Sequence, residues 1–220
     1  MVTASGLLDA MEGVAYVTDL DGIILDVGCE HFDRFARSEA GNIGLTGREV
    51  LGTSLFSYVS EGAVRDMVMR IHRRATSSME GSLTFETRCD SVKVKRMILN
   101  SVRPIVEDGE VKAVLYQSIT ASEKMRPPVM LVSTGDGVKV MQERDAVRYL
   151  HMCSYCARVG LPFNAPEEDM TWVSGPEYYK IYGDYPVSIT HGICSDCFGA
   201  LDAALKRPGS GDTVSLNQET

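Results

Sequence analysis

The sequence predicts an α+β fold in which helices cover one face of an antiparallel sheet, followed by a small cysteine-rich lobe. Three observations predict it. Apolar runs separated by Asp-Gly turns occur at both ends of residues 8–122, a stretch at helical period lies between them, and two CxxC pairs follow near the end. The chain has 220 residues, enough for one large domain or two small ones.

The first elements are a short helical piece and a β-hairpin. Leu7, Leu8 and Met11 indicate the helical piece at the N-terminus. Two strand-like runs, 14–18 and 23–27, flank a turn that ends in Asp-Gly, which is a hairpin signal. A short helix is then expected in CEHFDRFARSEAG, followed by a loop with a further short helix in LTGREVLGTSLFSYV.

The clearest helix of the sequence comes next. Its apolar residues recur at i, i+3, i+4, i+7 and i+11, and they are Val64, Met67, Val68, Ile71 and Ala75. Charged residues occupy much of the remaining surface, so this helix is expected to pack one face on the sheet.

Three more strands are predicted after this helix. The segment 82–88 alternates between apolar and polar side chains, and two longer apolar runs follow at 91–106 and 111–120. Asp108-Gly109 lies between the two long runs and predicts a second hairpin turn. The three strands therefore form an antiparallel meander.

This order of elements resembles a PAS domain over residues 8–122. The resemblance rests on YVTDLDGIILDVG, on LTGREVLGTSLFSYV and on the final hairpin ILNSVRPIVEDGEVKAVLYQSIT. It implies a bacterial sensory module with a five-stranded antiparallel sheet, helices on one face, and a small ligand or a redox state as the signal.

The composition changes after Thr120. Residues 123–149 contain Pro127-Pro128 and predict a linker that holds a hairpin around Gly135-Asp136-Gly137 and a helix in ERDAVRYLHM. Residues 150–206 form the predicted cysteine-rich lobe. Residues 207–220 are rich in Gly, Ser and Thr and predict a disordered tail.

Four of the six cysteines form the two pairs Cys153/Cys156 and Cys194/Cys197, which are separated by residues 157–193. A helix is expected to open at the second pair, because Phe198, Leu201 and Leu205 follow at helical spacing. One pair on a turn and one opening a helix can supply four sulfurs to a tetrahedral site, for which zinc is the first choice. A closed shell of four thiolates predicts a structural metal, because no coordination position is left for water or substrate. Iron is an alternative to zinc, since it can bind the same four ligands.

CSYC, a Trp172–Tyr178 element and HGICSDC together resemble a small cysteine-rich tail module that follows PAS domains in bacterial signalling proteins. In this chain Ser195 replaces the usual proline of the second pair. His191 is a competing metal ligand or a hydrogen-bonding neighbour of the site.

Other readings of these residues stay open. A redox dithiol formed by Cys153 and Cys156 is a further possibility. A motif of the thioredoxin type should follow a strand inside a βαβ pattern, and the sequence shows no such pattern before Cys153. His72, at the edge of the helical stripe, either flanks the core or binds heme, as a histidine on this helix does in some PAS domains. Cys29 and Cys89 lie outside any flavin-attachment motif and are predicted to be packing residues.

The remaining features exclude several function classes. The formal net charge is −8 and no Lys/Arg-rich arm occurs, which argues against nucleic-acid binding. No signal peptide or membrane-spanning run is found, so a cytoplasmic protein without membrane attachment is expected. No phosphate loop, nucleophile elbow or HExxH motif occurs, so we expect no enzyme.

We therefore predict a homodimeric signal-transduction sensor that binds a small molecule and acts by contact with a signalling protein. The alternatives are a heme-, flavin- or iron-bearing sensor, in which the cofactor does the sensing, and an enzyme with an open metal site.

Overall fold

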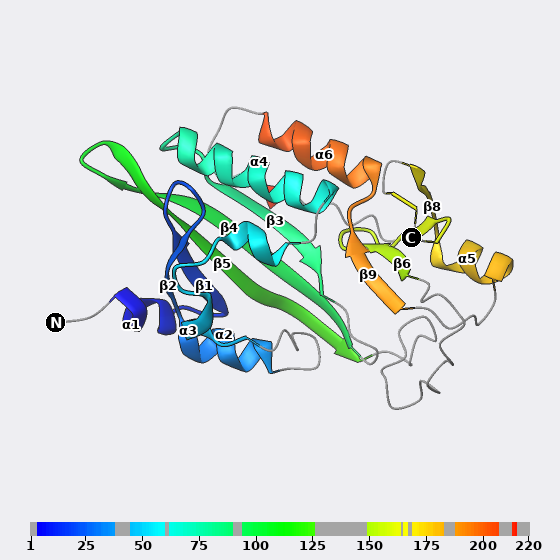
Figure 1. The fold of residues 1–220 in the computed structure, drawn as a ribbon, viewed down its shortest axis with the longest axis horizontal. Helices are drawn as coiled ribbons and strands as arrows, with labels where there is room; N and C mark the ends of the chain where they lie inside the picture. Colours follow the sequence, from blue (N-terminus) through cyan, green and yellow to red (C-terminus); the bar gives the residue numbers. More distant parts are fainter. Residues whose placement is uncertain are drawn as a thin grey trace.

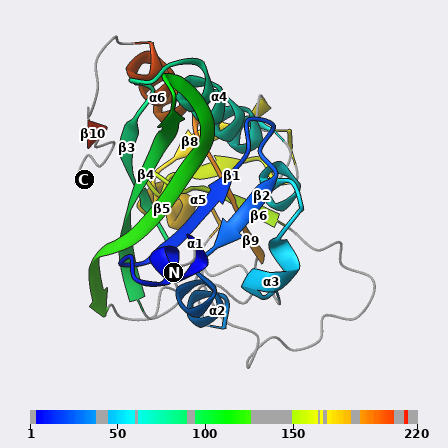
Figure 2. The ribbon, with the colours of Figure 1, turned by 90° about the vertical axis from the view of Figure 1, so that its left-hand side faces the viewer.

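The protein is described by a computed structural model that covers residues 4–37, 45–59, 62–89, 94–125, 149–163, 165–166, 169–182, 188–206 and 213–214. Its larger sheet has the strand order β10-β3-β4-β5-β1-β2 (Figures 1 and 2). The strands are β1 (Val14–Thr18), β2 (Ile24–Val27), β3 (Leu83–Arg88), β4 (Val94–Glu107), β5 (Glu110–Met125) and β10 (Thr213–Val214). β1 to β5 pair antiparallel throughout, as predicted.

Both predicted hairpins are present, and their turns show why. The Asp19 side chain accepts hydrogen bonds from the backbone N–H groups of Asp21 and Ile23, at 2.9 and 2.8 Å, which fixes the turn between β1 and β2. Between β4 and β5, Asp108 and Gly109 both have positive φ, 52° and 77°. Two such residues are what a type I′ turn needs, and that turn matches the twist of the strands it joins.

The long helix α4 (Ala63–Ser77) places its apolar stripe against the sheet. Met67, Ile71 and Ala75 are buried, as the periodicity predicts. The remaining helical elements of this half are α1 (Ala4–Asp9), α2 (Cys29–Ala36), α3 (Gly47–Val50) and η1 (Leu55–Tyr58). The helices and the sheet together enclose an apolar interior.

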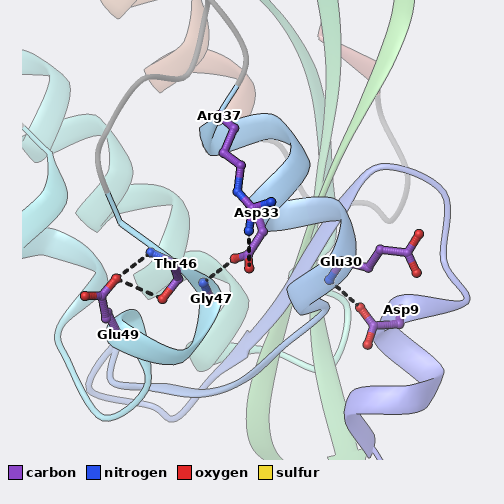
Figure 3. Close-up of polar contacts among 7 residues, drawn as sticks. All are labelled: Asp9, Glu30, Asp33, Arg37, Thr46, Gly47 and Glu49. Atoms are coloured by element: carbon purple, nitrogen blue, oxygen red, sulfur yellow. Dashed lines mark hydrogen bonds and ion pairs between the residues drawn. The ribbon is translucent and has the colours of Figure 1, made fainter.

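Hydrogen bonds fix α3 against α2 (Figure 3). The side-chain hydroxyl and the backbone N–H of Thr46 both donate to the Glu49 carboxylate at 2.8 Å, and this capping box starts α3. These bonds lower the pKa of Glu49. The backbone N–H of Gly47 donates to the Asp33 carboxylate on α2 at 2.7 Å, so the α3 N-terminus is held against α2.

A second, smaller sheet with the order β8-β7-β6-β9 forms the C-terminal lobe. Its elements are β6 (Tyr149–Cys153), β7 (Val159–Leu161), β8 (Thr171–Val173), α5 (Gly175–Tyr182), β9 (Ser188–Gly192) and α6 (Ser195–Leu205). The helix predicted in ERDAVRYLHM is wrong over residues 149–152, which form β6. Pairing with β7 on one side and β9 on the other overrides the local helical pattern.

The C-terminal lobe shares an apolar cluster with the N-terminal half, which runs from α1 to β5. α6 lies beside α4 in both views (Figures 1 and 2). The Arg70 guanidinium donates to the Asp202 carboxylate at 2.9 Å and lies 5.4 Å from the centre of the Phe198 ring. Leu201, fully buried, belongs to the same apolar cluster as Met67 on α4.

The predicted linker is seen only at its ends. β5 runs to Met125, and residues 126–148, with the predicted hairpin around Gly135–Gly137 and most of the predicted helix, lie outside the described residues. In the predicted tail, the described residues are Thr213 and Val214, which pair parallel with Thr84 and Phe85 on β3. This short strand has no signal in the Gly/Ser-rich sequence around it.

Candidate metal centre and adjoining cavity

The four paired cysteines come together from two places in the lobe. Cys153 is the last residue of β6, and Cys156 lies in the tight turn that follows. That turn is closed by the backbone N–H of Cys153 donating to the Arg158 carbonyl at 2.8 Å. Cys194 is the N-cap of α6 and Cys197 lies in its first turn, as the sequence predicts.

The geometry of the sulfurs fits a tetrahedral metal site. All four sulfurs lie within 4.8 Å of one another, and those of Cys156 and Cys194 are 3.6 Å apart. A zinc–sulfur bond of about 2.3 Å sets sulfur–sulfur edges of about 3.8 Å in a tetrahedron. Cys153, Cys194 and Cys197 are buried and Cys156 is half-buried, so little water reaches the cluster. All six cysteines are free thiols.

The four thiols of the cluster differ in pKa, so they differ in how readily each becomes a thiolate. Hydrogen bonds from Cys156, Cys194 and Cys197 lower the pKa of Cys153. The pKa of Cys156 falls to about 7, because its bonds with Cys194 and Cys197 outweigh the opposing bond with Cys153. Hydrogen bonding to Cys153 and Cys156 raises the pKa of Cys194 and Cys197. Four thiolates at this distance repel one another, and a divalent cation removes that repulsion.

Two contacts hold the cysteine loops in register. The backbone N–H of Cys194 donates to the Cys153 sulfur at 3.4 Å, which favours a thiolate there. Across the lobe surface, Arg158 pairs with Asp196 at 2.5 Å, joining the first cysteine turn to the first turn of α6. The side chain of His191, the competing ligand, lies outside the described residues.

A cavity of about 830 Å³ lies between the large sheet, the helices of the N-terminal half and the lobe. Most of its lining is apolar or aromatic and includes Tyr16, Phe32, Leu55, Val68, Phe85, Ile98 and Tyr116. Polar side chains gather on the strands at one part of the wall and include Thr87, Arg88, Arg96, Asn100 and Ser118. Small-molecule sites commonly combine an apolar wall with a few placed polar groups.

The polar part of the wall is internally bonded. The Asn100 amide donates to the Thr87 hydroxyl at 2.9 Å, and its carbonyl accepts from the Ser118 hydroxyl at 2.9 Å. These residues lie on β3, β4 and β5, so one hydrogen-bonded row crosses three strands. On β4, Arg96 pairs with Glu123 at 2.9 Å. None of these groups was predicted from the sequence, although the alternation of side chains along the strands was a signal that could have located them.

His72 is buried and bonded through both ring nitrogens. Nδ1 lies 2.8 Å from the Tyr116 hydroxyl, and Nε2 lies 3.0 Å from the Leu20 carbonyl. Because a carbonyl only accepts, the neutral ring carries its proton on Nε2 and accepts at Nδ1 from Tyr116. Heme ligation by His72, which stays a prediction, would break one of these bonds.

We expect Tyr116→Phe to destabilise the fold by about 1–3 kcal/mol, because it leaves a buried Nδ1 of His72 without its donor. Urea unfolding measures this loss. In a His72→Leu background the same substitution should cost clearly less, since no acceptor remains to be orphaned. Equal costs in the two backgrounds would show that the hydrogen bond contributes nothing.

The two remaining cysteines sit apart from the cluster. Cys29 is half-buried at the start of α2 and packs on the apolar core, which agrees with a packing role. Burial, with Asp9 and Asp33 nearby, raises the pKa of its thiol. Cys89 follows β3 and lines the cavity.

Comparison with known proteins gives structural neighbours only. No protein-family model matches the chain, and no curated protein does. Among solved structures, the PAS domain of BvgS from Bordetella pertussis aligns at 19% identity and a TM-score of 0.41, covering 54% of this chain and 83% of that one.

Two further neighbours are also PAS domains. PAS-B of Drosophila melanogaster Cycle, solved with bound ethylene glycol, aligns at 15% identity and a TM-score of 0.33, covering 49% of this chain and 98% of that one. The PAS domain of an HTR-like protein from Haloarcula marismortui aligns at 18% identity and a TM-score of 0.34, covering 53% of this chain and 87% of that one. Over the described residues, no helix is long and apolar enough to cross a membrane.

Proposed function

We propose that the protein is a signal-transduction sensor of the PAS type, which binds a small molecule in the cavity and holds a structural zinc ion in its four-cysteine centre. The observation that supports sensing is the cavity of about 830 Å³ between the sheet and the helices. The proposed output is contact with a signalling partner, by a cytoplasmic homodimer without catalysis of its own.

The lining favours a ligand with an apolar or aromatic body and an anionic end. Tyr16 and Tyr116 stack with ring centres 4.9 Å apart and present a flat aromatic wall. Arg34, Arg88 and Arg96 outnumber Glu12 and Glu123 among the charged lining residues. Guanidinium groups beside an apolar wall suit a carboxylate on a planar body.

The ligand site is tested with 2-naphthoate, which has an aromatic body and one carboxylate, by isothermal titration calorimetry on the zinc-loaded full chain. Val68→Trp fills the cavity from α4 and should abolish binding. Met69→Trp places the same ring on an exposed position of the same helix and should leave binding unchanged. Equal binding by both variants would place the probe elsewhere and refute the site.

The metal is tested by elemental analysis and the absorption spectrum of the purified protein. We expect one zinc per chain and a colourless solution, because zinc is redox-inert with a filled d shell. A Soret, flavin or iron–sulfur band would instead establish a cofactor-bearing sensor, and with a Soret band His72 becomes the ligand to test.

A further inference from the structure

The wall of the cavity includes parts of the cysteine loops themselves. Tyr155, which lies between the ligands Cys153 and Cys156, lines the cavity together with Ser154 and with Gly192, two residues before Cys194. The Tyr155 ring is buried, and it belongs to the same apolar cluster as Phe85 and Tyr116, which also line the cavity. The same four-residue turn therefore faces the metal centre on one side and the ligand space on the other.

Backbone hydrogen bonds fix this wall to both halves of the molecule. The Ser154 N–H donates to the Gly192 carbonyl at 3.0 Å, which joins the two cysteine loops. The Ser154 carbonyl accepts from the Arg88 N–H at 2.7 Å, which joins that turn to the end of β3. Any change in the turn between Cys153 and Cys156 is thus transmitted directly to the edge of the ligand space.

We propose that metal binding by the four cysteines and ligand binding in the cavity are positively coupled through Tyr155. This inference rests on the proposed function and adds its regulation. With metal bound, Cys153 and Cys156 are both held, and the Tyr155 ring is fixed as a wall. Without metal the turn loses its anchor, and a ligand must order that wall at the expense of its own affinity.

Coupling of this kind is reciprocal. If bound metal raises the affinity for the ligand by a given factor, bound ligand raises the affinity for the metal by the same factor. Such couplings between sites are commonly about 5- to 150-fold. A ligand that contacts Tyr155 would therefore raise the affinity for the metal, and removal of the metal by a chelator would lower the affinity for the ligand. Metal availability becomes a second input to the sensor.

The test measures zinc affinity of the full chain by competition with a chelator, with and without saturating 2-naphthoate. We expect 2-naphthoate to raise the zinc affinity at least about fivefold. In Tyr155→Leu, which keeps all four cysteines and an apolar side chain, the ratio should fall to one. The matched control is Tyr182→Leu, a half-buried ring of the same lobe that lies outside the cavity lining, and it should keep the ratio.

The outcomes separate the coupling from the function. Naphthoate binding to the zinc-loaded protein with unchanged zinc affinity would overturn the coupling and leave the proposed ligand site standing. No naphthoate binding by the zinc-loaded protein would count against the ligand site itself. A ratio that survives in Tyr155→Leu would show that the coupling, if present, runs through another contact, and would refute the role of this ring.

Discussion

Replacing Cys194 with serine is expected to release the metal and unfold the lobe over residues 149–206. Cys194 is fully buried, caps α6 and contacts the Cys153 sulfur through its backbone N–H. In small metal-bound modules the binding energy of zinc, about 10–16 kcal/mol, is also folding energy. Chelation of the wild-type protein should have the same effect, reversed when zinc is returned.

The measurement uses Trp172, the single tryptophan of the chain, which lies on β8 inside the lobe. Its fluorescence should shift to that of a solvated indole in Cys194→Ser, and the urea midpoint of the remaining circular dichroism signal should fall, because the larger sheet loses the part of the shared apolar cluster that the lobe supplies. Cys29→Ser is the matched control, since this thiol lies outside the cluster, and it should bind a full equivalent of zinc. Native Trp172 fluorescence with no bound metal would contradict the structural role.

Leu201→Ala should destabilise both halves of the molecule together. Leu201 is fully buried where α6 packs on α4, and it shares a cluster with residues of the sheet and of the cysteine loops. Removing a buried leucine side chain costs about 2–5 kcal/mol, since a cavity is left behind.

Urea unfolding, followed by Trp172 fluorescence and by circular dichroism, measures the effect of Leu201→Ala. Both midpoints should fall. Leu25→Ala removes the same atoms from an exposed position of β2 and should change the free energy of unfolding by less than about 0.5 kcal/mol. A shift confined to the fluorescence signal would mean that α6 stabilises the lobe alone.

The elements with strong local signals were predictable from the sequence. The stripe of α4 predicted the burial of Met67, Ile71 and Ala75, because a helix must turn its apolar face inward, whereas Val64 and Val68 of the same stripe are half-buried and line the cavity. Asp108-Gly109 located the β4–β5 turn, because both positions need positive φ. The spacing of the two cysteine pairs predicted that they supply four sulfurs to one site, and the structure brings those sulfurs together.

Features that depend on tertiary contacts were not predictable. Residues 149–152 carry a helical pattern, yet pairing with β7 and β9 makes them a strand. That strand leads directly into Cys153. Its partners β7 and β9 both follow it in the chain, so no preceding βαβ pattern is seen in the described residues, and the gathering of four sulfurs favours a metal site.

The placement of Tyr155 was a further such feature. Nothing in CSYC indicates that the tyrosine lines a cavity whose other walls come largely from residues between Glu12 and Glu123, far earlier in the chain. His72 is similar, because its partners Tyr116 and Leu20 are brought to it only by the packing of α4 on the sheet.

We infer that the C-terminal lobe and the N-terminal half unfold together, because one apolar cluster joins them beside the smaller cluster within the lobe. It is tested most directly by urea unfolding of the zinc-loaded full chain, followed at once by Trp172 fluorescence and by far-ultraviolet circular dichroism. The shared cluster predicts a single cooperative transition with coincident midpoints. Two separate transitions, with the Trp172 signal changing at a different urea concentration from the sheet, would contradict it.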